Sequence, residues 1–148
     1  MFKVSQSYPE IGRSLAVLHV DDDPMNLRVV EEILGAFGHT SVRAASGVEA
    51  LERLAEQPFD VVLMDIHMPG MSGIETLRCL RALPGPAAAT PVIALTADVI
   101  SRRPDEYRAL GFQDYVAKPI LVSGLLGAIK DCLSPKPAAG AQRVRRTG

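Results

Sequence analysis

The amino-acid sequence predicts a single α/β domain built on an open, doubly wound parallel sheet with helices on both faces. Short apolar runs without polar alternation recur along the chain, as expected for strands that are covered on both faces. Segments with apolar residues at helical spacing separate these runs, so five strand–helix units follow one another and imply right-handed crossovers. The length of 148 residues fits one compact unit that buries a core without disulfides or metals.

The first strand is expected at residues 15–20, a mostly apolar run that an acidic cluster ends. A helix is expected after Pro24, because apolar residues recur there at helical spacing until Gly38, which supplies a stop. The apolar face of this helix comprises Leu27, Val30, Ile33, Leu34 and Phe37.

A second strand is expected at residues 41–45. Ser46 and Glu49 have the spacing of a capping box and therefore open the next helix. The apolar face of that helix is expected to include Val48, Leu51, Leu54 and Ala55.

The third strand, at residues 59–64, runs directly into Asp65. A loop rich in Pro and Gly follows and leads to a second capping box, formed by Ser72 and Glu75. The helix that begins there carries an apolar face of Ile74, Leu77, Cys79, Leu80 and Leu83.

Residues 84–91 have the composition of a linker, and residues 91–97 are expected to form a fourth buried strand. Pro104 lies inside the next helical segment, residues 101–110. The helix there is therefore expected to be short, irregular or begun at Pro104, with Gly111 as its stop.

The fifth unit is a short strand at Asp114–Ala117 and a helix at residues 121–133. One face of this helix carries Leu125, Leu126, Ile129 and Leu133. We therefore divide the chain into an N-terminal extension (residues 1–13), the α/β domain (residues 14–133) and a basic tail (residues 134–148). The tail has no periodic apolar content and is expected to be disordered.

The formal charge is nearly balanced, with 16 Lys and Arg against 17 Asp and Glu and a net charge of −1. This balance excludes a general electrostatic attraction to nucleic acid or membranes. The tail carries four bases and no acid, whereas residues 1–133 carry 12 bases against 17 acids. The tail could contact a partner or nucleic acid, although a solvated tail is the simpler interpretation.

No apolar run is long enough to span a bilayer, and the first 13 residues lack the apolar stretch of a signal peptide. A cytoplasmic location is therefore expected. Cys79 and Cys132 have no His or Cys near them at ligand spacing, so we expect both to be buried, reduced thiols without a role.

Polar residues follow the predicted strands at the point where each strand ends. In open α/β sheets, ligands bind beyond the carboxyl ends of the strands, so these side chains are expected to share one site. Crowded carboxylates favour a hard cation such as Mg²⁺, while a lysine offers a positive charge for an anion. Metal, anion and nucleophilic carboxylate together indicate phosphoryl transfer onto an aspartate. The residues are Asp21, Asp22, Asp23, Asp65, Thr96 and Lys118.

Four motifs in this order carry a family resemblance: VDDDPMN, VVLMDIHMPGMSG, VIALTAD and DYVAKPI. They resemble the motifs of the receiver domains of bacterial two-component response regulators, over roughly residues 15–133. The resemblance implies a flavodoxin-like (βα)₅ fold that takes a phosphoryl group from a phosphohistidine. The donor would be a histidine kinase or a histidine phosphotransfer protein, and the signal would pass to a downstream protein partner.

The resemblance also implies roles for the acidic residues. Asp65 resembles the phosphoacceptor and contributes to Mg²⁺ binding. Asp22 resembles a direct Mg²⁺ ligand, and Asp21 resembles its companion that acts through water. The backbone carbonyl of His67 matches the third protein ligand. Asp23 lies where the family varies and is left out of the site.

Three further residues match family positions at later strand ends. Lys118 resembles the lysine that holds a phosphoryl oxygen, and Thr96 resembles the hydroxyl that moves toward the phosphate on activation. Tyr115 matches the aromatic switch by its spacing to the lysine, although a core tyrosine is the alternative. The resemblance suggests a cis bond before Pro119, and Gly73 is expected where a backbone passes closely.

The motifs MDIHMPGMSG and ALTAD are similar to those of receivers attached to hybrid histidine kinases, so the chain is expected to be such a receiver or a stand-alone one. It would not be an enzyme in the usual sense, although it would catalyse its own phosphorylation and dephosphorylation. The family places the donor surface on the first helix, with the loop after Lys118. It places the signalling surface on the fourth helix, fifth strand and fifth helix. No direct DNA or membrane binding is expected.

Three other classes of function compete with this interpretation. A nucleotide-binding protein of similar fold would need a phosphate loop, but GxxxxGK and GxGxxG are both missing from the sequence. A phosphatase with an aspartate nucleophile could use the spacing of Asp21 and Asp23, but it would leave Asp65 unexplained. A receiver that only docks partners, without phosphorylation, stays open as the alternative.

Overall fold

The computed structural model describes residues 10–98, 100 and 102–133. Five strands form one parallel sheet in the order β2-β1-β3-β4-β5. The strands are β1 (Ala16–Val20), β2 (Thr40–Ala44), β3 (Val61–Asp65), β4 (Val92–Thr96) and β5 (Asp114–Ala117). The chain reverses its direction of travel across the sheet between β2 and β3, so the predicted doubly wound fold is confirmed.

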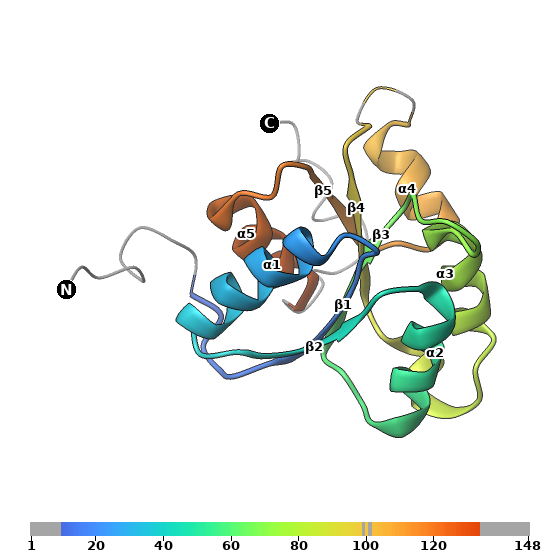
Figure 1. Ribbon diagram of the computed structural model, residues 1–148, viewed down its shortest axis with the longest axis horizontal. Coiled ribbons are helices and arrows are strands. Elements are labelled where there is room, and N and C mark those ends of the chain that lie inside the picture. The colour runs from blue at the N-terminus through green and yellow to red at the C-terminus, as the bar shows by residue number, and fades with distance from the viewer. Residues whose placement is uncertain (1–9, 99, 101, 134–148) are drawn as a thin grey trace, which may run out of the picture.

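Helices cover both faces of this sheet. In Figure 1, α1 and α5 lie on one side of the strands, and α2, α3 and α4 lie on the other. The bounds of the helices are α1 (Pro24–Ala36), α2 (Gly47–Glu56), α3 (Gly73–Arg81), α4 (Pro104–Leu110) and α5 (Val122–Leu133). The predicted linker between α3 and β4 contains one short 3₁₀ helix, η2 (Gly85–Ala89).

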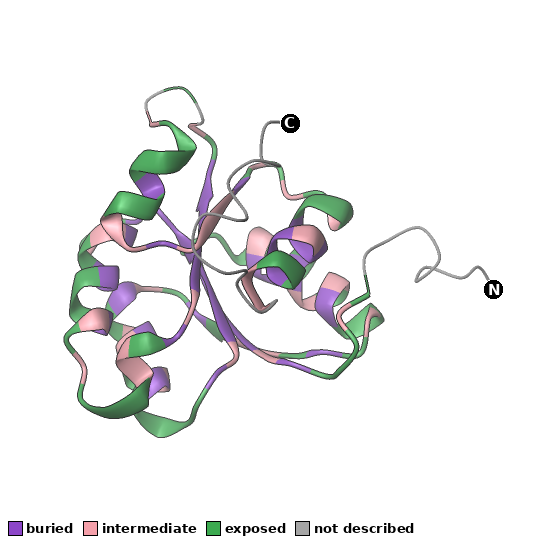
Figure 2. Cartoon of the chain, turned by 180° about the vertical axis from the view of Figure 1, so that it is seen from behind, coloured by how far each residue is buried: buried purple, intermediate pink, exposed green. Residues whose placement is uncertain are grey.

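Each face of the sheet has its own apolar core. Alternate side chains of a strand point to opposite faces, so Leu18 and Val20 pack toward α2 and α3, whereas Leu15 and Val17 pack toward α1 and α5. All five residues of β3 and of β4 are buried. Figure 2 shows the buried strands between helices whose outer faces are exposed. The residues at the carboxyl ends of β3 and β4 therefore lie on strands that are buried on both faces.

The predicted apolar face of α2 is partly wrong. Val48 and Ala55 are exposed, while Ala50 and Leu54 are buried and Leu51 is half-buried. The buried stripe comprises Gly47, Ala50 and Leu54, and residues 48 and 55, which are seven apart, lie together on one side of it.

The cap of α2 also differs from the prediction. Ser46 accepts the N–H of Glu49 as expected, but the Glu49 carboxylate accepts from the N–H of Ala45 instead of that of Ser46. By contrast, Ser72 and Glu75 form the predicted capping box of α3.

The prediction of a buried Cys79 thiol is wrong, because Cys79 is exposed. Gly73, Thr76, Leu77 and Leu80 occupy the inward stripe of α3 instead. Thr76 satisfies its buried hydroxyl by donating it to the carbonyl of Ser72, at 2.8 Å, within the same helix. Cys132 on α5 is half-buried.

The prolines and glycines of the later segments act as predicted. Helix α4 begins at Pro104 and ends at Gly111, whose φ of 112° lies in the left-handed region. Among the described residues, no helix is long and apolar enough to cross a membrane. The expected disorder of residues 134–148 lies outside the described residues, as does most of the expected N-terminal extension.

Candidate functional site

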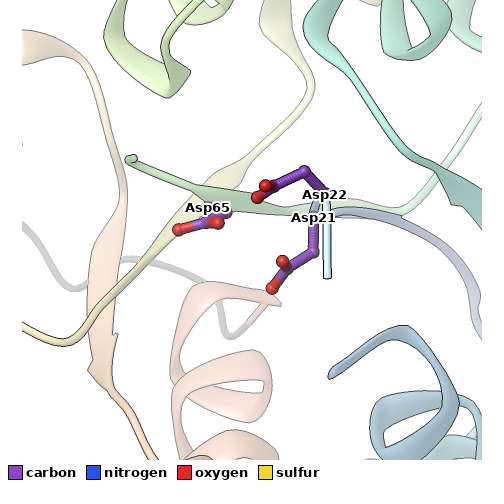
Figure 3. A group of neighbouring side chains, drawn as sticks. All are labelled: Asp21, Asp22 and Asp65. Carbon is purple, nitrogen blue, oxygen red and sulfur yellow. The ribbon is translucent and has the colours of Figure 1, made fainter. Parts of the chain in front are cut away.

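Three carboxylates meet where two neighbouring strands end. Asp21 and Asp22 directly follow β1, and Asp65 is the last residue of β3, which pairs with β1. Each of the three residues places one carboxylate oxygen within 4.8 Å of the others. Figure 3 shows the three side chains gathered at this edge of the sheet. The structure therefore brings together the acidic residues that the sequence predicts.

The three carboxylates differ in their exposure to solvent. Asp21 and Asp65 are buried, whereas Asp22 is exposed. Asp21 accepts the N–H of Asp23 at 2.9 Å, and Asp65 accepts the N–H of His67 at 3.3 Å. Two buried carboxylates are thus fixed by the backbone beside a third one that water can reach.

The three carboxylates carry more negative charge than the one neighbouring lysine, Lys118, can balance. Burial and, next, the nearby charge of Asp21 raise the pKa of Asp65 to about 6, although Lys118 and the N–H of His67 act in the opposite direction. An additional cation beside these oxygens would relieve the repulsion. Carboxylate oxygens are the ligands that Mg²⁺ prefers, so the residues present fit a Mg²⁺ site.

Lys118 is the cation of the cluster. Its ammonium nitrogen lies 3.1 Å from Oδ2 of Asp21 and 3.2 Å from Oδ1 of Asp65. Burial alone would lower the pKa of Lys118, but the two carboxylates outweigh it and hold the pKa above its usual value. The peptide bond between Lys118 and Pro119 is cis, which is the bond that the sequence predicts to be cis.

Thr96 lies at the end of β4, on the strand next to Asp65. Its side chain is buried, and its hydroxyl contacts the backbone of Asp98. The hydroxyl accepts the N–H of Asp98 at 3.0 Å and donates to the carbonyl of Asp98 at 3.3 Å. Thr96 therefore reaches this edge of the sheet while its hydroxyl is held by the loop that follows β4.

Tyr115 is half-buried on β5 and packs against the core cluster beneath α3 and α4. Its ring is stacked on that of Tyr107, with centroids 5.4 Å apart and an interplanar angle of 16°. This contact is compatible with both sequence interpretations, a core tyrosine and an aromatic switch. The switch role stays a prediction.

The loop after β3 passes tightly over the backbone of Asp65. The N–H of Gly73 donates to the carbonyl of Ile66 at 2.9 Å. A Cβ at position 73 would collide with the carbonyl oxygen of Asp65, so glycine is required there, as the sequence predicts. The imidazole of His67 is exposed on this loop, and the expected role of its backbone carbonyl stays a prediction.

Asp23, which is not expected to belong to the site, has a structural role. Its carboxylate accepts the N–H of Met25 at 2.9 Å and caps the N-terminus of α1.

Sequence reasoning missed His19, which lies directly behind Asp21. Its side chain is 1% exposed, and its Nε2 lies 3.9 Å from Oδ2 of Asp21. Neither ring nitrogen has a hydrogen-bond partner among the described residues. Burial lowers its pKa to about 4, even though the charge of Asp21 favours the protonated ring. The available signal was its position two residues before Asp21, which places both on the same face of a strand.

The fold and the site together define a class of protein: a doubly wound α/β domain with a carboxylate cluster, a lysine and a threonine at the carboxyl edge of its sheet. The chain belongs to the response regulator receiver domain family, whose model matches residues 17–130.

Known proteins similar to this chain include a kinase and two solved receiver structures. The signal transduction histidine-protein kinase BarA of Escherichia coli is 38% identical over 107 residues, which is 72% of this chain and 12% of BarA. The chemotaxis response regulator CheY4 of Vibrio cholerae is 30% identical with a TM-score of 0.74, and the match covers 82% of this chain and 100% of that one. The chain thus spans a small part of its kinase relative and the whole of a solved receiver.

The second solved structure is the receiver domain of the sensor histidine kinase PA1611 from Pseudomonas aeruginosa. It is 29% identical to this chain with a TM-score of 0.72, and the match covers 80% of this chain and 97% of that one. That structure has a magnesium ion coordinated in its active site cleft. This chain is therefore a receiver domain homologous to the receivers of hybrid kinases.

Proposed function

We propose that this receiver accepts a phosphoryl group from a phosphohistidine on Asp65 and signals through protein–protein contacts. The observation that carries the proposal is the position of the Lys118 ammonium group, which contacts both Asp65 and Asp21 at the edge of the sheet. A positive charge beside a buried carboxylate is suited to hold a phosphoryl oxygen while that carboxylate is the nucleophile.

Mg²⁺ is the cofactor that the donor set fits best. Asp22 and Asp65 would bind it directly, together with the backbone carbonyl of His67, and Asp21 would act through water. Bound Mg²⁺ would supply positive charge to the oxygens of the transferring phosphoryl group. The raised pKa of Asp65 supports this assignment, because a bound cation would lower that pKa and favour the ionised form that attacks.

In the proposed reaction, a carboxylate oxygen of Asp65 attacks the phosphorus in line and the imidazole of the donor leaves. Lys118 neutralises charge on the phosphoryl oxygens during transfer. The acyl phosphate adds about 1.5 to 2 negative charges and new acceptor oxygens, which attract the Thr96 hydroxyl. A shift of Thr96 would then bias the domain between two conformations. The domain would thus catalyse its own modification and would not act on other substrates.

A protein histidine is the donor that the surroundings of the site favour. Met25 and Val29 of α1 and Leu121 before α5 are exposed apolar side chains on the segments that adjoin Asp22 and Lys118 in sequence. They offer contact area for a helical partner such as a histidine kinase or a histidine phosphotransfer protein. A net charge of −1 gives no support for direct contact with DNA or a membrane.

The test of this proposal is phosphorylation by a small phosphodonor. The protein is incubated with acetyl phosphate with and without Mg²⁺, and its intact mass is measured. We expect one phosphoryl group to add only with Mg²⁺, and Asp65→Asn to prevent it. Asp60→Asn is the matched control, because Asp60 precedes the same strand at its opposite end and should leave phosphorylation unchanged.

The alternative is a docking module that works without phosphorylation. Failure of the wild type to gain a phosphoryl group from acetyl phosphate or a phosphorylated histidine phosphotransfer protein would favour this alternative. Full phosphorylation of Asp65→Asn would contradict Asp65 as the acceptor.

A further inference from the structure

Tyr107 of α4 extends its hydroxyl to the backbone that follows β4. Its side chain is 2% exposed, and its hydroxyl donates to the carbonyl oxygen of Asp98 at 3.4 Å. The hydroxyl of Thr96 donates to the same carbonyl oxygen at 3.3 Å. A carbonyl oxygen has two lone pairs, so one backbone acceptor serves both side chains.

The position of the Tyr107 hydroxyl is fixed by ring contacts. The ring of Tyr115 stacks on it at 5.4 Å, and the ring of Phe112 meets it edge-on at 6.2 Å with an interplanar angle of 73°. The hydroxyl therefore stays near the Asp98 carbonyl when only Thr96 changes its conformation.

The shared carbonyl lowers the free-energy cost of moving the Thr96 hydroxyl away from Asp98. Both donor–acceptor distances exceed the usual value of about 2.7–2.8 Å between hydroxyl and carbonyl oxygens, so each bond alone is weak. If Thr96 moves to a phosphoryl oxygen, the Asp98 carbonyl loses one donor. Tyr107 keeps its own bond to that carbonyl and can shorten it, which offsets part of the cost of losing a partner.

We infer that Tyr107 is a positioning residue for the Thr96 switch: its hydroxyl holds the Asp98 carbonyl when Thr96 turns to the phosphoryl group. The inference rests on the proposed function, because it requires a phosphoryl group on Asp65. In this arrangement, contacts from Thr96 through the Asp98 carbonyl to Tyr107 connect the site with helix α4. Tyr107 favours the phosphorylated conformation in this arrangement.

The experiment uses Tyr107→Phe, which keeps the ring contacts and removes only the hydroxyl. Beryllium fluoride with Mg²⁺ serves as the probe, since it occupies the place of the phosphoryl group without covalent transfer. We expect Tyr107→Phe to bind beryllium fluoride about fivefold more weakly, equivalent to ~1 kcal/mol, by isothermal titration calorimetry. The affinity for Mg²⁺ alone should be unchanged, because Mg²⁺ binding needs no movement of Thr96.

The matched control is Thr40→Val, which removes a hydroxyl–carbonyl bond of similar length between Thr40 and Leu15, at the opposite edge of the sheet. It should leave beryllium fluoride affinity unchanged. A loss of Mg²⁺ and beryllium fluoride affinity together in Tyr107→Phe would indicate general damage to the site and overturn the inference.

A double-mutant cycle with Thr96 separates positioning from packing. In the Thr96→Val background, the effect of Tyr107→Phe should fall below about twofold, because no hydroxyl remains to move. In the Thr96→Ser background, which restores a hydroxyl, the effect should reappear.

Three outcomes separate a failure of this inference from a failure of the proposed function. Wild-type protein that binds no beryllium fluoride in the presence of Mg²⁺ would contradict the proposed function itself. If the wild type binds beryllium fluoride and Tyr107→Phe binds it with equal affinity, only the role of Tyr107 is overturned. The same holds if Tyr107→Phe causes an equal loss of affinity with Thr, Val and Ser at position 96.

Discussion

The ammonium nitrogen of Lys118 lies 3.2 Å from Oδ1 of Asp65. Asp65 ends β3, and β3 pairs with β1, the strand that Asp21 directly follows. Lys118 also contacts Asp21, so one cation serves two buried carboxylates. The net result is a raised pKa of Asp65, about 6, because burial and the Asp21 charge together outweigh the lysine. The site thus stores electrostatic repulsion in the folded state when no divalent cation is bound.

The first prediction is that Asp65→Asn stabilises the protein without Mg²⁺ at pH 7. The folded-state pKa of Asp65 is raised above its unfolded value, so ionisation destabilises the fold as the pH rises from about 4 through 6. The neutral amide removes this penalty, and we expect a gain of about 1–3 kcal/mol in the free energy of unfolding. Urea unfolding in EDTA at pH 7 measures it.

Two controls define this first result. Asp105→Asn makes the same charge change at an exposed position of α4 and should alter stability little. The gain of Asp65→Asn should disappear below pH 4, where the wild-type carboxyl is protonated in both states, and it should shrink at pH 7 with Mg²⁺. A gain that is constant with pH would contradict the electrostatic explanation.

The second prediction is that Asp22→Asn weakens Mg²⁺ binding while the neighbouring Asp23→Asn does not. Asp22 contributes an exposed carboxylate to the cluster, whereas the Asp23 carboxylate caps α1. Asn is also a good N-cap, so Asp23→Asn keeps the helix start and changes only a nearby charge. We expect about a tenfold loss of Mg²⁺ affinity for Asp22→Asn, or ~1.4 kcal/mol, by calorimetry. Equal losses in both variants would mean that the net charge of the loop, and not a ligand, controls Mg²⁺ binding.

Much of this site could be predicted from the sequence because parallel strands bring their carboxyl ends to one edge. The strand patterns alone place Asp21, Asp65 and Lys118 at that edge, and the structure joins them within ion-pair distance. The capping signal of Ser72 likewise fixes the start of α3 from local chemistry alone. Features set by local spacing or by strand ends are therefore the ones that sequence reasoning predicts well.

Other features depend on packing between elements, which periodicity does not specify. Hydropathy favours Cys79 over Thr76 for the buried face of α3, yet Thr76 lies on that face, where its hydroxyl donates to the carbonyl of Ser72 in the same helix. The link from Tyr107 to Thr96 passes through the Asp98 carbonyl and depends on how α4 is oriented on the sheet. His19 is a polar residue in an apolar strand, and only the three-dimensional structure shows what surrounds it.

The third prediction concerns the pH dependence of stability that His19 causes. Burial lowers its folded pKa to about 4, and the charges of Asp21, Lys118, Glu31 and Arg43 act on it in opposing directions. The unfolded ring binds a proton near its usual pKa of about 6.5, so stability is lost as the pH falls from 6.5 toward 4.

His19→Leu should therefore flatten this part of the pH profile in EDTA. Leucine is apolar and similar in size, so it also removes two buried ring nitrogens that lack partners among the described residues. At pH 5 we expect the variant to be more stable than the wild type by about 1–2 kcal/mol in urea unfolding. His67→Gln, at an exposed position, is the control and should retain the wild-type slope. A wild-type slope in His19→Leu would assign the acid sensitivity to other groups.

The fourth prediction is that Gly73→Ala damages both the fold and the proposed reaction. A Cβ there would meet the carbonyl oxygen of Asp65 and lie 2.9 Å from the Cα of Ile66. Both are backbone atoms of the segment that carries the acceptor, so they cannot move aside as a flexible side chain would. We expect a loss of about 1–3 kcal/mol in the free energy of unfolding.

The same displacement should slow phosphorylation by acetyl phosphate, because it shifts the Asp65 backbone relative to Lys118. The matched control is Gly127→Ala in α5, where a Cβ meets no described atom within 4 Å. Alanine is a better helix former than glycine, so this control should gain about 0.5–1 kcal/mol and keep its phosphorylation rate. Urea unfolding and time-resolved intact mass measure the two effects separately. If Gly73→Ala matched Gly127→Ala in both assays, the close approach of α3 would have no part in placing the acceptor.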